Sequence, residues 1–146
     1  MEKDYTINEV AMMTGLTPRT LRNYIKANYL CGKKYDGIWR FSLKEVTDFV
    51  LNQNVRPSIQ AKSKAIVYDF LIDSLKSQNE ICTIINLYEP NGKTNEISEF
   101  FCKKINTTQD SGELKFSFEK VGYNVRVILK GTEKQVINIL NCYYNR

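Results

Sequence analysis

The segment TPRTLRNYIKANYL, residues 17–30, gathers side chains that bind the groups exposed on nucleic acids. Arginine can donate two hydrogen bonds to guanine, and asparagine can pair with adenine in the same way. Arg19, Arg22 and Asn23 are therefore candidates for contacts to bases or close to them. Three of the fourteen residues are cationic and none is acidic. This chemistry suits a surface that meets an anionic partner.

The positive charge of the chain is concentrated around this segment. The formal net charge is +5 over 146 residues. Residues 17–44 hold seven Lys or Arg against one acid, whereas residues 57–146 hold twelve against ten. Because the excess is local, it can be interpreted as a binding footprint.

Capping signals predict two short helices here. Thr6 and Glu9 form a capping box that predicts a helix over about 7–13. Thr17 followed by Pro18 predicts the start of a second helix, because proline suits the first helical position. A glycine lies between them, and two short helices joined through such a turn are typical of a helix-turn-helix.

The second helix has an anchoring face and an outer face. Leu21, Tyr24 and Ile25 form an apolar stripe, and the helix is expected to stop near Asn28. The side chains left on the outer face are Arg19, Thr20, Arg22, Asn23 and Lys26.

A cationic hairpin, or wing, is predicted next. Asp36 and Gly37 favour the positive dihedral angles of a tight turn between strands at residues 32–35 and 38–41. A wing of this kind holds phosphates and fixes the register of the recognition helix on DNA. Its candidate backbone-binding residues are Lys33, Lys34, Tyr35 and Arg40.

A domain boundary is predicted after one more helix. Ser42 and Glu45 form a second capping box that starts this helix. Residues 52–64 are polar, contain a proline and show no sustained apolar period. We therefore expect a winged helix-turn-helix domain at residues 1–54 and a second domain at 58–146.

The first domain also resembles a known family. YTINEVAMMTGLTPRTLRNYIKANYL followed by DGIWRFSLKEV is similar to the DNA-binding domain of MerR-type regulators and of phage and transposon excisionases. TPRTLRNY resembles the MerR recognition helix, and GIWRFS resembles the excisionase wing. The resemblance covers about residues 5–52, and the MerR continuation into a long dimerisation helix is not matched, so metal or drug sensing is not implied. It implies DNA contacts from Arg19, Thr20, Arg22, Tyr24 and Arg40. The complete set of candidate DNA-binding residues is Thr17, Arg19, Thr20, Arg22, Asn23, Tyr24, Lys26, Lys33, Lys34, Tyr35 and Arg40.

The rest of the chain predicts an α+β domain in which helices cover a small three-stranded sheet. Thr94 or Asn95 is expected to cap the middle helix, and Ile137 to pack the last helix on the sheet. The predicted order is a helix at about 59–77, a buried strand at 80–88, a helix through 97–105, a hairpin turning at Gly122, and a helix at about 133–144. The apolar residues of the first of these helices are Ala65, Tyr68, Leu71, Ile72 and Leu75.

Catalytic and metal sites are not indicated. The four cysteines are widely spaced, and the chain has no histidine, so the commonest general base is missing. Gly92, Lys93 and Thr94 resemble the end of a phosphate-binding loop, but Leu87 stands where that loop needs its first glycine. We expect no enzymatic activity, no metal and no cofactor.

Location and partners follow from the same patterns. No apolar run approaches the roughly 20 residues that span a bilayer, and the amino terminus has no signal sequence. We expect a cytoplasmic chain that binds double-stranded DNA and no membrane. A homodimer is expected because one small reading head gives limited affinity. A small-molecule or protein effector is a further partner that the sequence leaves open.

The leading functional hypothesis is a sequence-specific DNA-binding transcriptional regulator, whose second domain assembles the dimer, senses an effector, or both. One alternative is an excisionase-like architectural factor that bends DNA. The other is a protein-interaction or small-molecule-binding module whose winged domain docks partners without binding DNA.

Overall fold

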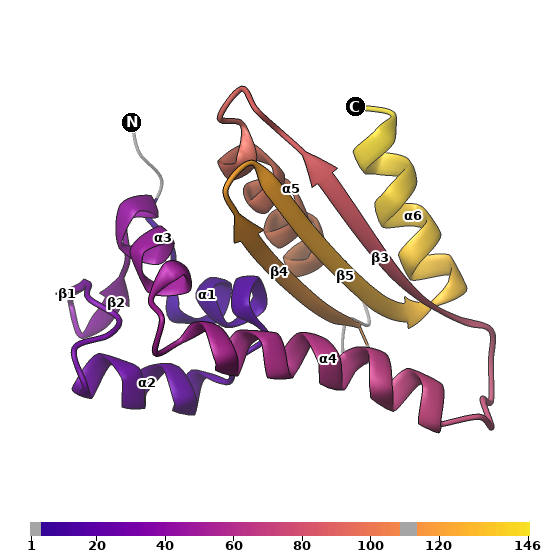
Figure 1. Ribbon diagram of the computed structural model, residues 1–146, viewed down its shortest axis with the longest axis horizontal. Coiled ribbons are helices and arrows are strands. Elements are labelled where there is room, and N and C mark those ends of the chain that lie inside the picture. The colour runs from indigo at the N-terminus through magenta and orange to yellow at the C-terminus, as the bar shows by residue number, and fades with distance from the viewer. Residues whose placement is uncertain (1–3, 109–113) are drawn as a thin grey trace.

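The computed structural model describes residues 4–108 and 114–146, and these form an α+β fold (Figure 1). The elements are α1 (Ile7–Thr14), α2 (Pro18–Lys26), β1 (Lys33–Tyr35), β2 (Ile38–Arg40), α3 (Leu43–Leu51), α4 (Arg56–Ile72), β3 (Glu80–Tyr88), α5 (Thr94–Thr107), β4 (Lys115–Val121), β5 (Asn124–Thr132) and α6 (Glu133–Tyr144). No helix among the described residues is long and apolar enough to cross a membrane.

The first two helices begin where their caps predict. Thr6 Oγ1 accepts a hydrogen bond from the Glu9 amide at 3.2 Å, and Glu9 Oε1 accepts one from the Thr6 amide at 3.1 Å. Thr17 Oγ1 accepts one from the Thr20 amide at 3.1 Å, with proline in the first turn of α2. Asn28 has a positive φ of 64° just after α2, a conformation that favours the end of a helix.

The wing forms as the turn sequence predicts. Asp36 and Gly37 have φ angles of 51° and 79°, the left-handed pair that a two-residue hairpin turn requires. β1 pairs antiparallel with β2. Tyr5 then exchanges two backbone hydrogen bonds with Phe41, of 2.7 and 2.9 Å, which ties the start of the chain to the base of the wing.

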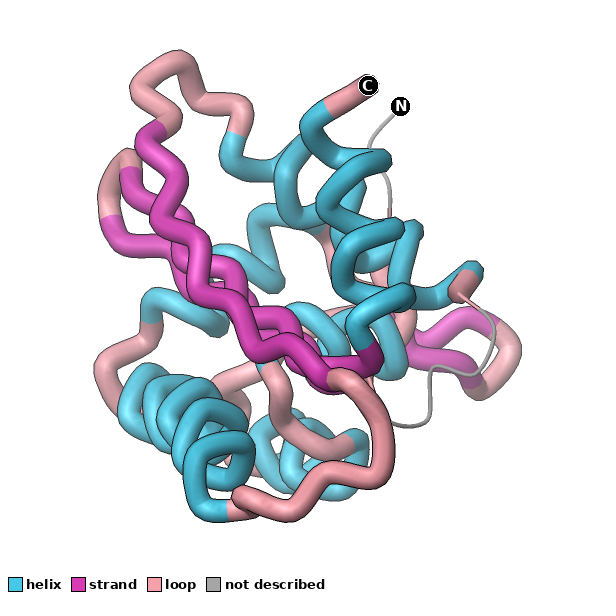
Figure 2. Tube along the Cα trace, turned by 90° about the vertical axis from the view of Figure 1, so that its right-hand side faces the viewer, coloured by secondary structure: helices cyan, strands magenta, loops and turns pink. Residues whose placement is uncertain are grey.

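The second half forms a three-stranded antiparallel sheet in the order β3-β5-β4. Helices α5 and α6 cover one face, where Phe101 stacks on Phe116 at 6.0 Å and on Tyr143 at 5.0 Å. On the other face, Ser63 of α4 makes a short hydrogen bond with Ser117 of β4. Figure 2 shows α4 on one side of the strands and α6 on the other.

The two halves share buried surface. Helices α1 and α3 lie against β4, and Tyr5 donates a hydrogen bond to Glu99 of α5 at 3.1 Å. One cluster of buried apolar side chains runs from Val10 and Val46 to Phe118. The division into domains at 1–54 and 58–146 stays a prediction.

Helix α4 differs from its predicted position at both ends. It begins at Arg56, before the expected start at about 59 and inside the segment where the domain boundary is predicted, because Pro57 lies in its first turn, where a missing amide costs nothing. It ends at Ile72, five residues before the expected 77. Lys76 folds back there and donates to the Phe70 carbonyl at 3.2 Å, which satisfies a helix-end acceptor.

Three further expectations are wrong in detail. The strand at 80–88 is an edge strand rather than a buried one, so Ile84 remains 51% exposed. Ile137 is 43% exposed, and Ile139 is buried in its place. The cap of α5 is Lys93, without a side-chain hydrogen bond, instead of a threonine or asparagine cap.

Candidate nucleic-acid interface

A groove of about 500 Å³ lies between α2 and the wing. Arg22 and Lys26 come from the helix, and Lys34 comes from β1. The groove therefore joins the two elements that the sequence assigns to DNA contacts. The residues that line it are Ile7, Arg22, Ile25, Lys26, Lys34, Gly37, Ile38 and Trp39.

The helix presents its polar side outward because its apolar side is held by the core. Leu21 is fully buried, and Ile25 packs against the buried cluster. The exposed side chains of residues 17–26 are Thr17, Arg19, Arg22, Asn23 and Lys26. Their exposure leaves their donors accessible to a ligand.

The cations of this surface are not neutralised from within. In the part of the chain that the structure describes, no carboxylate forms an ion pair with any of them. An unpaired cationic surface attracts phosphates and gains affinity by releasing their counterions. The cations concerned are Arg19, Arg22, Lys26, Lys33, Lys34 and Arg40.

Two wing cations lie directly opposite each other. Lys33 pairs with Arg40 across the two strands. Like charges in that position destabilise a hairpin, and a phosphate between them would remove the repulsion. Tyr35 is also exposed on β1, whereas Arg40 is half-buried.

Trp39 is a groove residue that the sequence interpretation did not select. It pairs with Lys34 across the wing, and the Lys34 ammonium lies 5.1 Å from the centre of its ring. Its ring also stacks on Phe41 at 6.1 Å. The two-residue turn fixes this register, so the pairing of Lys34 with Trp39 could have been found from the hairpin sequence.

Tyr24 and Thr20 face partners within the chain. The Tyr24 hydroxyl forms a 2.8 Å hydrogen bond with Ser58 Oγ on α4, and its ring packs edge-on against Phe49 and Tyr29. The Thr20 hydroxyl accepts from Thr17 at 3.0 Å. Tyr24 thus has the anchoring position that the apolar stripe predicts, and its contact with DNA stays a prediction.

Within the described ranges 4–108 and 114–146, no group of three or more Cys, Asp and Glu side chains could hold a metal ion. None of the four cysteines, all of which lie in these ranges, forms a disulfide: Cys31 is exposed, Cys102 is buried, and Cys82 and Cys142 are half-buried. Burial raises the pKa of the Cys82 thiol, opposed by the nearby Lys130 and Lys76.

Comparison with known proteins identifies the first part of the chain. Residues 5–54 match the family model described as a helix-turn-helix domain. No curated protein and no solved structure matches the chain. The amino-terminal segment is a helix-turn-helix domain, and this supports DNA binding, with DNA as its partner.

Proposed function

We propose that the chain is a sequence-specific transcriptional regulator. The observation that carries the proposal is the exposed groove between α2 and the wing, whose cations have no carboxylate partner in the described residues. It belongs to a segment that matches a helix-turn-helix domain. Such a domain places its second helix in the major groove and its wing on the backbone.

Each side of the groove has its own role in the proposed complex. Arg19, Arg22 and Asn23 on α2 read base edges, because arginine and asparagine can form paired hydrogen bonds with guanine and adenine. The wing residues neutralise phosphates and fix the helix in register. The partial positive charge at the amino-terminal end of α2, which comes from the helix dipole, also favours a phosphate there.

The second half of the chain serves assembly, effector sensing, or both. Helix α4 supports this because it touches α2 through Ser58 and the sheet through Ser63. A signal or a partner at the sheet therefore has a direct structural path to the reading helix. Cytoplasmic location, the absence of a cofactor and the absence of enzymatic activity belong to the same proposal.

The test is a titration of Arg22→Ala against a selected binding site and a random duplex at fixed salt. We expect the variant to lose about 1–3 kcal/mol on the selected site and part of its sequence preference. Lys103→Ala is the matched control, since it removes one exposed cation from α5. It should leave sequence preference unchanged. Binding by the unaltered protein should weaken steeply with salt.

Three outcomes would count against the proposal. Unchanged affinity and preference in Arg22→Ala would remove the assignment of α2 as the reading helix. Failure of the unaltered chain to bind any duplex at low salt would favour a docking module. Strong bending with cooperative spreading along DNA would favour an architectural factor.

A further inference from the structure

Strand β3 exposes a long edge that lacks the usual protection. It pairs with β5 through nine consecutive residues, without a bulge, and only β5 pairs with it in the described sheet. The strand EICTIINLY has one charged residue, Glu80, and no proline or glycine. Edge strands normally carry charges, prolines or bulges because a bare edge pairs with another chain. Figure 2 shows this edge between α4 and α6, turned toward the viewer.

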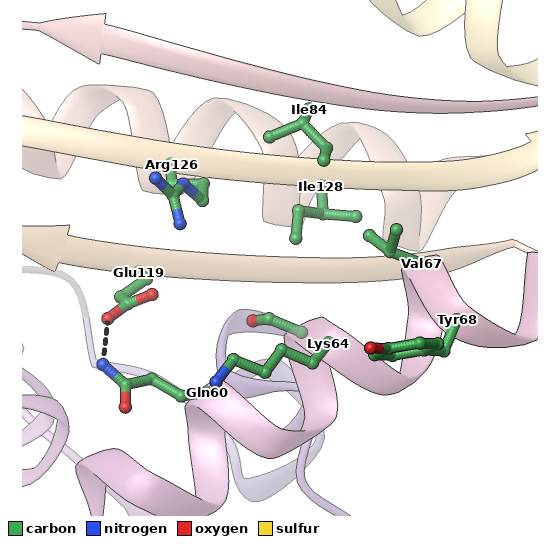
Figure 3. A pocket seen from close by; sticks show the side chains of 9 residues that line it. Gln60, Lys64, Val67, Tyr68, Ile84, Glu119, Arg126 and Ile128 are labelled. Atoms are coloured by element: carbon green, nitrogen blue, oxygen red, sulfur yellow. Dashed lines mark hydrogen bonds between the residues drawn. The ribbon is translucent and has the colours of Figure 1, made fainter.

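Apolar side chains flank the same edge. On α4, Tyr68 is 63% exposed, Leu71 69% and Ile72 74%. Tyr68 and Ile84 line one groove of about 480 Å³ between α4 and the open face of the sheet (Figure 3). On the α6 side, Ile137 is exposed as well. Exposed apolar side chains on both sides of a bare strand edge are typical of an interaction site.

We propose that β3 pairs antiparallel with β3 of a second copy of the chain. A two-fold axis at Ile84 would join the two three-stranded sheets into one six-stranded sheet. The inference rests on the proposed function, because the paired β3 strands would form the dimer that this function expects. Its test measures assembly without DNA.

The sequence of β3 is complementary to itself about Ile84. Full-length pairing places Ile81 opposite Leu87 and Thr83 opposite Ile85, so it sets no like charges opposite each other. Ile84 already lies opposite Ile128 of β5. The pairing would therefore extend this row to four isoleucines on the open face, beneath the two α4 helices. A strand paired with its own copy also satisfies the symmetry of a two-fold dimer.

The size of the edge is sufficient for a specific dimer. Nine strand residues extend about 30 Å along the edge. The edge is roughly 20 Å high, because the sheet lies between two helix layers, each about 10 Å from it. Each copy would then bury about 600 Å², or about 1,200 Å² in total, the lower limit for a stable specific interface.

The proposed dimer leaves the reading heads free. Figure 1 places α2 and the wing at one side of the molecule and β3 at the opposite side. Pairing through β3 would therefore not cover the cationic groove. Two reading heads would stand at the outer ends of a continuous sheet.

The test is sedimentation or light scattering of the full chain without DNA, from low concentration to about 100 µM, where a micromolar dimer is nearly complete. We expect a dimer. Ile84→Lys should raise its dissociation constant about tenfold or more, because the two introduced charges meet at the axis. Tyr68→Lys, on the helix above, should act in the same direction. The control is Val121→Lys, at an exposed position on β4, which should leave the dimer intact.

A monomeric unaltered protein, or variants that dimerise as it does, would overturn the inference. Circular dichroism checks that each variant is folded. If Ile84→Lys does not fold, the dissociation constant of Tyr68→Lys tests the inference instead. A dimer that binds no DNA would contradict the proposed function alone. A monomer that still binds DNA would contradict only the dimer through β3.

Discussion

Tyr5 shows how a single buried side chain joins the two halves of the molecule. Its side chain is fully buried, and its hydroxyl donates to Glu99 Oε1 at 3.1 Å. Burial first, and then the nearby Glu99 carboxylate, raise the pKa of this phenol above its ordinary value. The folded chain therefore holds this proton at a pH where the unfolded chain releases it.

Tyr5→Phe should lower the free energy of unfolding by about 1–2 kcal/mol at neutral pH, since it removes a hydrogen bond to a charged acceptor. The raised pKa means that the unaltered protein loses stability as pH rises past about 10. The variant has no phenol at this position, so its deficit should narrow there. Urea titrations of both proteins across this range measure the gap, and a constant deficit would contradict the assignment.

The residues of the candidate site differ in how directly the sequence predicts their role. The contact of Arg19, Arg22 and Asn23 with DNA stays a prediction. Their types carry the chemistry, and helical spacing puts them on one face, so they were selected directly from the sequence. Trp39 was not, because its contribution depends on which side chain faces it across the wing. Pairing across strands depends on register, which comes here from the two-residue turn at Asp36 and Gly37 and not from either strand alone.

At the scale of elements, the contact between α2 and α4 sets the position of α2, the helix proposed to read bases. Tyr24 and Ser58 lie 34 positions apart in the chain, and their hydroxyls share a 2.8 Å hydrogen bond. The Tyr24 ring packs against Phe49 of α3 as well. Any movement of α4 at this point would therefore reach the groove.

A double-mutant cycle tests this link. Tyr24→Phe and Ser58→Ala should each lower the free energy of unfolding by about 1 kcal/mol, and the double variant should lose hardly more than either. The same variants separate two roles of Tyr24. If its hydroxyl contacts DNA, Tyr24→Phe should weaken DNA binding more than Ser58→Ala; if it only anchors α2, the two effects should match.

Elements with local signals were predicted well, and those fixed by distant contacts were not. The capping boxes at Thr6 and Ser42 and the turn at Asp36 are specified by neighbours in the chain, and all three are confirmed. The end of α4 depends on Lys76 folding back onto the Phe70 carbonyl, which its apolar spacing does not encode, and the edge position of β3 depends on long-range pairing. The run at residues 80–88 has one charge and no proline, so it lacks the usual marks of an edge strand and has the composition of a buried one.

For the whole molecule, the open question is whether its two halves unfold together. Phe118 of β4 is 6% exposed, and it lines one small cavity with Met13 of α1 and Val46 of α3. A shared core of this kind favours one cooperative transition. The sequence boundary at 54–58 favours two.

Phe118→Ala distinguishes these possibilities, because the only tryptophan, Trp39, lies on the wing and reports on the first half. We expect a loss of about 3–5 kcal/mol, with tryptophan fluorescence and helical circular dichroism shifting to the same lower urea midpoint. Val121→Ala, on the same strand but exposed, should change either midpoint little. A fluorescence midpoint that stays in place while the dichroism midpoint falls would mean two independent domains. The wing and α2 would then not depend on the sheet for their stability, and the proposed coupling from β3 or α4 to the cationic groove would have no structural basis.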